Sequence, residues 1–283
     1  MKKILLSVLL ILIIAVTGCG VGLNYGDAYI DAADVPVYNG QRYVKLGQPA
    51  FTEEDFERGD FEEYSPLDSL GRCGQAFALI TPETMPTEER ESISEIKPSG
   101  WHTVRYDDLI DDKYLYNRSH LIAFSLAGEN ANEENLITGT QHFNQELMLP
   151  WEEKVFFYVR RTGNSVLYRV TPIFEGNNLI ATGVQMEAFS VEDDGRGVCF
   201  NVFVHNVQPG IELDYATGDS WRADGYSEGD TEGEYILNTN SKKFHYPHCD
   251  GAAEISAHNR DEYEGSRKKL IDKGYEPCGR CNP

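Results

Sequence analysis

The stretch that decides the fold of this chain reads Tyr-Asn-Arg-Ser-His-Leu-Ile and occupies positions 116–122. Asn-Leu-Ile-Thr follows at 135–138, and Asn144 and Glu152 stand eight positions apart in a segment of helical composition. On one continuous helix, eight residues make close to two turns, so both side chains would share a face. Pro150 suits the first turn of a helix, and it divides the prediction into a helix ending at Leu149 and another over 151–161.

The segments on either side of this stretch predict strands. A strand signal runs from Cys73 to Ile80, and Trp101 to Arg105 alternates apolar and polar residues. Beyond the helix, apolar runs separated by the turns 175–178 and 193–195 predict an antiparallel meander over 166–174, 179–190 and 198–207. The predicted class is α+β with a central antiparallel sheet.

The side chains in the central stretch suit phosphodiester hydrolysis. That reaction needs a base for the attacking water and a cation to offset charge on the phosphate oxygens. A histidine suits the first task because its ordinary pKa lies near neutral pH. An amide suits the metal because it binds Mg²⁺ without cancelling its charge, and an arginine pairs with phosphate oxygens.

These motifs resemble the DNA/RNA non-specific endonucleases of the ββα-metal fold, including the DNA-entry nucleases and streptodornases. The resemblance covers roughly 71–220 and implies His120 as the general base and Arg118 as a phosphate contact. It also implies Asn144 as the ligand of Mg²⁺, or of Mn²⁺ in its place, with Glu152 holding that metal through water. The implied activity is cleavage of DNA, with RNA as a second substrate, without sequence preference.

The chain departs from the family's Asp-Arg-Gly-His motif at two positions, Asn117 and Ser119. The aspartate's charge is absent, and serine lacks the backbone freedom of glycine. His142, two residues from Asn144, is the rival for the general base, although residues so close together on a helix point to different faces. Asn135 is expected to anchor the loop. The alternative function is that of a non-catalytic, DNA-capturing surface lipoprotein.

The N-terminus has the layout of an export signal. Two lysines precede an apolar run over 4–16, and small residues lead to Cys19. The run is short for a membrane span, and a cysteine at the cleavage position resembles a bacterial lipoprotein signal. We therefore expect a signal peptide over 1–18, lipidation of Cys19, attachment to the membrane, and a location on the extracellular face of the cell membrane. DNA-uptake machinery is a candidate partner.

The formal net charge of −21 argues against tight nucleic-acid binding through a broad basic face. Acids predominate over 26–99 and 176–234, whereas 100–175 and 235–283 are closer to balance. Substrate is therefore expected to be held locally, by a metal ion and a few arginines.

The last cysteines follow the spacing of a metal site. His245 and Cys249, then Cys278 and Cys281, form two pairs with 28 residues between them. Soft ligands in this pattern fit tetrahedral zinc, and the module resembles the zinc-binding domain of the Ada DNA-repair protein with His245 at the first cysteine position. His248 is the alternative ligand, and a disulfide among the three cysteines is the rival arrangement.

The remaining cysteines leave one pairing open. Cys73 and Cys199 stand alone in apolar surroundings, so they are either a disulfide or buried thiols. The predicted organisation is a signal peptide at 1–18, an acidic tether and lead-in at 19–70, a nuclease domain at 71–224, a linker at 225–234 and a small zinc-binding module at 235–283.

Overall fold

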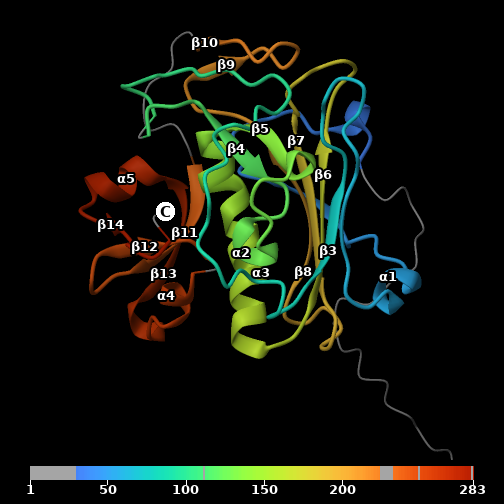
Figure 1. Ribbon diagram of the computed structural model, residues 1–283. Helices are drawn as coiled ribbons and strands as arrows, with labels where there is room; N and C mark the ends of the chain where they lie inside the picture. The colour runs from blue at the N-terminus through green and yellow to red at the C-terminus, as the bar shows by residue number, and fades with distance from the viewer. Residues whose placement is uncertain (1–29, 111, 224–231, 248, 282) are drawn as a thin grey trace, which may run out of the picture.

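The computed structural model describes residues 30–110, 112–223, 232–247, 249–281 and 283. The predicted signal peptide, Cys19 and His248 lie outside these residues. A large α+β domain and a smaller C-terminal module lie side by side (Figure 1). Among the described residues, no helix combines the length and apolar character that crossing a membrane requires.

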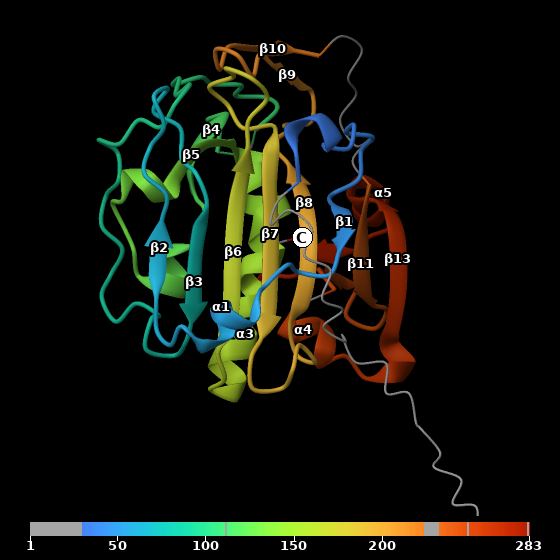
Figure 2. The same cartoon turned by 90° about the vertical axis from the view of Figure 1, so that its right-hand side faces the viewer.

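An antiparallel six-stranded sheet forms one layer of the large domain, in the order β1-β8-β7-β6-β3-β2. Figure 2 shows it face on. Its strands are β1 (Val44–Gly47), β2 (Glu62–Tyr64), β3 (Ala76–Ile80), β6 (Val166–Ile173), β7 (Gly183–Ser190) and β8 (Cys199–His205). The consecutive strands β6, β7 and β8 are neighbours, which confirms the meander. Every residue of β6 and β7 is buried, as expected for central strands covered on both faces.

The stretch quoted above forms a ββα unit that packs on one face of this sheet. β4 (Tyr116–His120) pairs antiparallel with β5 (Leu136–Thr140). The π-helix η3 (Phe143–Met148) follows and leads directly into α3 (Leu149–Thr162). Short helices α2 (Phe124–Ala127) and η2 (Glu133–Asn135) lie between β4 and β5.

Helix α3 is held against the sheet by its apolar face. Val155, Tyr158 and Val159 are buried and share a core with Tyr168 of β6. Gly163 ends the helix in the left-handed conformation, with φ of 74°, and its N–H donates to the carbonyl of Val159. The helix therefore presents its first turn, with Glu152, at a fixed place beside β4 and β5.

The lead-in assigned to 19–70 contributes to the sheet, which corrects the predicted boundary at residue 71. β1 and β2 are the two edge strands, and the short helices η1 (Ala32–Asp34) and α1 (Glu53–Glu57) flank them. Both edge strands are short and half exposed, so their sequence carries little apolar alternation. Their polar composition resembled that of a tether.

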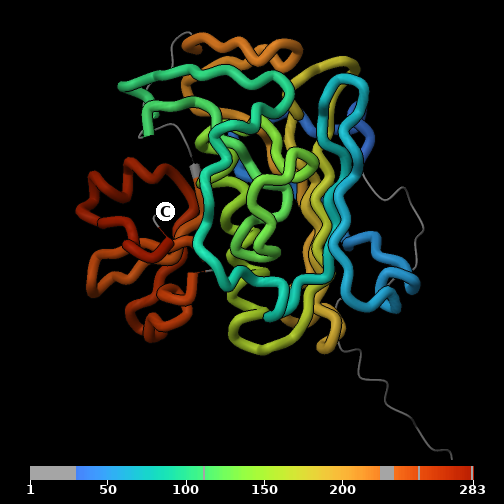
Figure 3. The backbone as a smooth tube through the Cα atoms, in the orientation of Figure 1, coloured from blue at the N-terminus to red at the C-terminus, as the bar shows by residue number. Residues whose placement is uncertain are grey.

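The strand predicted over 101–105 is absent, and Arg105 forms only an isolated bridge with Tyr114. Trp101 and Val104 instead pack in a small cluster with Ile110 and Leu115. Between β3 and β4, the described residues 81–110 and 112–115 form a long connection without a helix or an extended strand (Figure 3). The alternation of apolar and polar residues over 101–105 did not produce a strand, because no neighbouring strand among the described residues lies beside this segment.

Cys73 is a free, buried thiol, so the Cys73–Cys199 disulfide does not form. Its sulfur donates to the carbonyl of Leu136 at 3.1 Å. Burial raises the pKa of Cys73 to about 12, so the thiol stays protonated.

The C-terminal module is built on a four-stranded sheet in the order β13-β11-β12-β14. Its strands are β11 (Glu232–Asn238), β12 (Lys243–His245), β13 (Arg260–Ser266) and β14 (Glu276–Pro277), and its helices are α4 (Asp250–Ala253), η4 (Ala257–Asn259) and α5 (Arg267–Asp272). β11 includes residues 232–234, which corrects the end of the predicted linker. A separate hairpin of β9 (Ile211–Leu213) and β10 (Ser220–Arg222) precedes the module.

Candidate active site and metal cluster

His120 lies at the end of β4, and its side chain is buried. Its Nε2 lies 2.9 Å from the backbone carbonyl of Asn130. Because a carbonyl only accepts, Nε2 must carry the hydrogen and Nδ1 must be the accepting nitrogen. The Nη2 atom of Arg90 approaches this Nδ1 at 3.4 Å. The imidazole is thus oriented to accept a proton at Nδ1.

The surroundings of His120 keep it neutral. Burial lowers its pKa, and the nearby charge of Arg90 lowers it further, although the carbonyl of Asn130 acts in the opposite direction. An imidazole with a pKa below its ordinary value is unprotonated at neutral pH. This is the form that a general base requires.

Asn144 and Glu152 lie on the joined helices η3 and α3. Eight residues of an α-helix overshoot two turns by about 80°. The π-helix η3 has wider turns, which reduce this overshoot and bring the two side chains closer to one face. The sequence predicted two helices divided at Pro150, whereas the structure has a continuous helix in which Pro150 lies within the first turn of α3.

The two side chains offer oxygen donors of the kind that Mg²⁺ prefers. The carboxamide of Asn144 has no hydrogen-bond partner among the described residues, so its oxygen is available. Burial raises the pKa of Glu152 to about 8, with a contribution from the charge of Glu153, while Arg90 acts to lower it. The charge of Arg90 therefore lowers the pKa of both His120, on strand β4, and Glu152, on helix α3. One amide and one carboxyl group, which a bound cation would keep ionised, fit a single Mg²⁺ with water completing the coordination.

Arg118 is partly exposed, but its guanidinium is bonded within the protein. Its Nε and Nη2 donate to the backbone carbonyls of Ile96 and Ser94, and its guanidinium lies 4.1 Å from the centre of the Trp101 ring. It therefore fastens the 81–115 connection to β4. Arg90, carried by that same connection, is the arginine that approaches His120, and sequence reasoning missed it because it stands within the acidic run 88–91.

The departure at Ser119 is accommodated by a glycine on the neighbouring strand. A Cβ on Gly139 would lie 2.2 Å from the Ser119 hydroxyl, so the serine occupies space that Gly139 leaves open. Ser119 lies in a regular strand and has no positive φ, so the backbone freedom of glycine is not required there. Its hydroxyl is buried without a partner.

The other two residues considered in the sequence are held in structural contacts. The Nδ1 of His142 lies 3.2 Å from a carboxylate oxygen of Glu146, one turn along the helix. Asn135 is buried, and its carboxamide accepts from the N–H of Ile122 and donates to the Ile122 carbonyl. Asn135 thus ties the α2 loop to β5, as a loop anchor does.

His245, Cys249, Cys278 and Cys281 come together in the C-terminal module. All four are buried, and one ligand atom from each lies within 4.8 Å of the others. The thiols of Cys249, Cys278 and Cys281 are free. A hydrogen bond from Cys281 lowers the pKa of Cys249, and the same bond raises that of Cys281.

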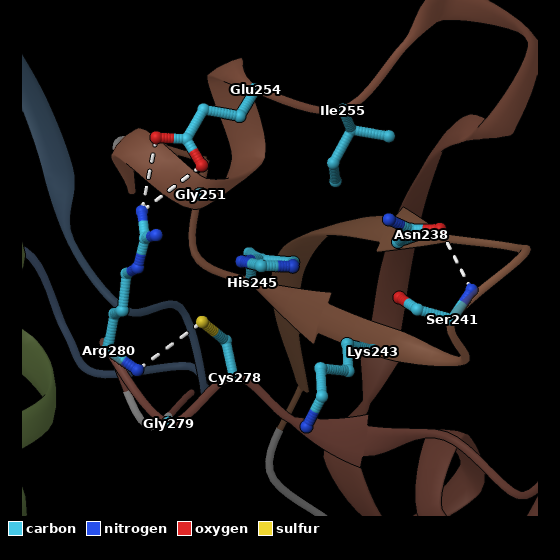
Figure 4. A pocket seen from close by; sticks show the side chains of 10 residues that line it. All are labelled: Asn238, Ser241, Lys243, His245, Gly251, Glu254, Ile255, Cys278, Gly279 and Arg280. Atoms are coloured by element: carbon cyan, nitrogen blue, oxygen red, sulfur yellow. Dashed lines mark hydrogen bonds and ion pairs between the residues drawn. The ribbon is translucent and has the colours of Figure 1, made fainter.

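One side of this cluster opens into a pocket of about 420 Å³. Figure 4 shows His245 and Cys278 among the residues that line it, together with Lys243 and Arg280. Arg280 pairs with Glu254 at 3.2 Å. Buried imidazole and thiol ligands at this separation fit a tetrahedral zinc ion.

Comparisons with known proteins agree with the fold of the large domain. A model of the DNA/RNA non-specific endonuclease family matches residues 53–192. Among solved structures, the chain is similar to NucA from Streptococcus agalactiae with magnesium ion bound, at 25% identity over 58% of this chain and 80% of that one, with a TM-score of 0.52. NucA with no metal bound gives 26% identity over 58% and 78%, with a TM-score of 0.51.

The sheet with its β4–β5–α3 unit defines the ββα-metal class of nuclease fold. The chain belongs to the DNA/RNA non-specific endonuclease family through residues 53–192. The match begins at α1, inside the segment that the sequence had assigned to the lead-in.

Proposed function

We propose that this protein is a metal-dependent endonuclease that hydrolyses phosphodiester bonds of DNA, and of RNA as a second substrate, without sequence preference. The observation that carries the proposal is the orientation of His120, whose Nε2–H is committed to the carbonyl of Asn130 and whose Nδ1 faces Arg90. A neutral base beside a guanidinium is suited to water attack on an anionic phosphate.

Each residue has one task in this mechanism. His120 accepts the proton of the attacking water at Nδ1, and the carbonyl of Asn130 stabilises the imidazolium that results. Arg90 donates to a phosphate oxygen next to that water. Asn144 and Glu152 would hold Mg²⁺ or Mn²⁺, and the bound metal supplies positive charge against the phosphate. Arg118 keeps the Arg90 connection in place.

Substrate range tests the absence of sequence preference. Duplex DNA fragments of unrelated sequence should be cut at many internal positions, and transcripts of the same sequences should be cut more slowly. Digestion of end-labelled fragments on a sequencing gel measures this. Cleavage confined to one short sequence would show a site-specific enzyme.

Replacing Arg90 with Gln should move the acid limb of the rate profile toward higher pH. The positive charge of Arg90 lowers the pKa of His120, so removing it raises that pKa and protonates the base at a higher pH. The measurement is kcat/KM between about pH 5 and 8. Arg105→Gln, a change on the same connection at an exposed ion pair with Asp107, should leave the limb in place. If the acid limb of the pH profile of Arg90→Gln coincides with that of the unaltered protein, the charge of Arg90 does not set the pKa of His120.

We also propose that His245, Cys249, Cys278 and Cys281 hold structural zinc, and that the module contributes a second contact for nucleic acid. Cys281→Ser should lose the metal and the fold of residues 232–283, because so small a core depends on it. Metal analysis should find close to one zinc per chain in the unaltered protein and far less in the variant. Protein without zinc whose thiols had become disulfides would exclude this assignment.

The N-terminal sequence supports a lipid-anchored form on the outer face of the cell membrane, with DNA-uptake machinery as a candidate partner. Cys19→Ala should release the protein into the medium. Retention of the variant on membranes, at the level of the unaltered chain, would contradict lipidation at this residue.

A further inference from the structure

Arg42 connects the C-terminal module to the helix that carries Asn144. It precedes β1, and its Nη2 donates to the carbonyl of Glu146 at 2.5 Å and to the hydroxyl of Tyr246 at 2.9 Å. Its guanidinium carbon also lies 4.6 Å from the centre of the Tyr246 ring. Glu146 belongs to the π-helix η3, and Tyr246 belongs to the C-terminal module. One side chain therefore bonds to both parts of the molecule.

The carbonyl of Glu146 lies where the π-helix η3 passes into α3. In α-helical spacing its donor would be the residue four positions later, and here that residue is Pro150, which has no N–H. Arg42 supplies a charged donor to this carbonyl. The contact lies two residues from Asn144, in the only π-helix among the residues that the structure describes. It braces the backbone that sets the direction of the Asn144 carboxamide.

The other end of the contact is tied to the metal cluster. Tyr246 follows His245 in the chain, and its carbonyl accepts from the N–H of Cys249 at 3.1 Å. Its ring stacks on Tyr235, with ring centres 6.1 Å apart. The position of its hydroxyl thus depends on the loop that carries two of the four candidate zinc ligands.

We propose that Arg42 is a positioning residue for the nuclease metal site, and that through Tyr246 it makes Mg²⁺ binding at Asn144 depend on zinc in the C-terminal cluster. This inference rests on the proposed function, because it assigns Asn144 to Mg²⁺. The C-terminal module is then a brace for the catalytic helix as well as a contact for substrate. Zinc loss or thiol oxidation would weaken the nuclease without touching its active-site residues.

The test measures two quantities: the dissociation constant for Mg²⁺, by calorimetric titration of the full-length protein without DNA, and the Mg²⁺ concentration that gives half-maximal cleavage. Arg42→Ala should raise both quantities by about 10-fold or more, as expected for residues that orient a metal ligand. Its effect on the rate at saturating Mg²⁺ should be smaller. Tyr246→Phe should give a smaller rise, because the ring remains. Arg42→Lys should restore part of the loss.

The matched control is Arg161→Ala. Arg161 also joins the two parts, through an exposed ion pair with Asp250 at 3.6 Å, but the structure gives it no contact with η3. It should leave both Mg²⁺ measurements unchanged. A loss of thermal stability shared by Arg42→Ala and Arg42→Lys, with unaltered Mg²⁺ binding in both, would show a purely structural role and overturn the proposal.

The zinc dependence is tested by combining variants. Cys281→Ser should raise the Mg²⁺ requirement to a similar degree, and adding Arg42→Ala to it should produce little further change, because both break one connection. Additive effects would overturn the coupling. If the unaltered protein cleaves no nucleic acid, the proposed nuclease function fails. If it cleaves and Arg42→Ala matches it in both Mg²⁺ measurements, only this inference fails.

Discussion

His120→Ala is expected to reduce cleavage by about 10²- to 10⁴-fold while the fold and DNA binding are preserved. The imidazole is placed to accept the water proton at the end of β4, because its Nε2–H is committed to the carbonyl of Asn130 and Nδ1 is left as its accepting nitrogen. Single-turnover cleavage of a short duplex measures the loss. Circular dichroism and DNA-binding measurements establish that the fold and the substrate contacts remain.

The matched control is His142→Ala. His142 is equally buried, but its Nδ1 pairs with Glu146, so its removal should cost stability more than rate. Imidazole added to the His120→Ala protein should restore part of the activity, because the substitution leaves a space of the same shape. Activity of His120→Ala within a few-fold of the unaltered enzyme, together with a large loss in His142→Ala, would move the base to His142.

Asn144→Ala is expected to raise the Mg²⁺ requirement and lower the maximal rate, because a direct oxygen ligand is lost. The effect should exceed that of Glu152→Ala, because the carboxylate of Glu152 acts through water. Loss of a partner that acts in this indirect way typically lowers affinity or activity by about 10- to 100-fold. Cleavage rates across a Mg²⁺ series, with calorimetric titration in parallel, separate weaker binding from slower chemistry.

A nearby asparagine provides the comparison for Asn144. Asn135→Ala removes a buried amide bonded to both backbone groups of Ile122, so its main effect should be on thermal stability. Full activity of Asn144→Ala at low Mg²⁺ would remove this residue from the metal site.

The sequence predicted the centre of the molecule well because strong local patterns encode it. The meander β6–β7–β8 consists of long apolar runs separated by turn residues, and nearly all residues of these strands are buried. The candidate metal-site residues Asn144 and Glu152 stand on one short segment, so their spacing could be recognised in the sequence. The four candidate zinc ligands could be recognised for the same reason, since they form two local pairs in the sequence.

What the sequence did not predict depends on contacts between distant residues. The edge strands β1 and β2 are short and polar, and their pairing with β8 and β3 defines them. Arg90 reaches His120 across 30 positions of irregular chain, and its acidic neighbours suggested a solvated loop. Arg42 bonds to residues 104 and 204 positions away, which no local pattern records. The π-helix was also unforeseen, because its sequence predicts an ordinary helix.

The most direct test of the central claim is nicking of supercoiled plasmid DNA by the purified mature protein. Reactions should contain Mg²⁺, Mn²⁺, or a chelator, with His120→Ala protein assayed in parallel. We expect conversion to open-circular and then linear and fragmented DNA with either metal, no conversion with chelator, and little with the variant. Intact plasmid at every metal concentration, or equal cleavage by the His120→Ala protein, would contradict a metal-dependent nuclease that uses His120 as its base.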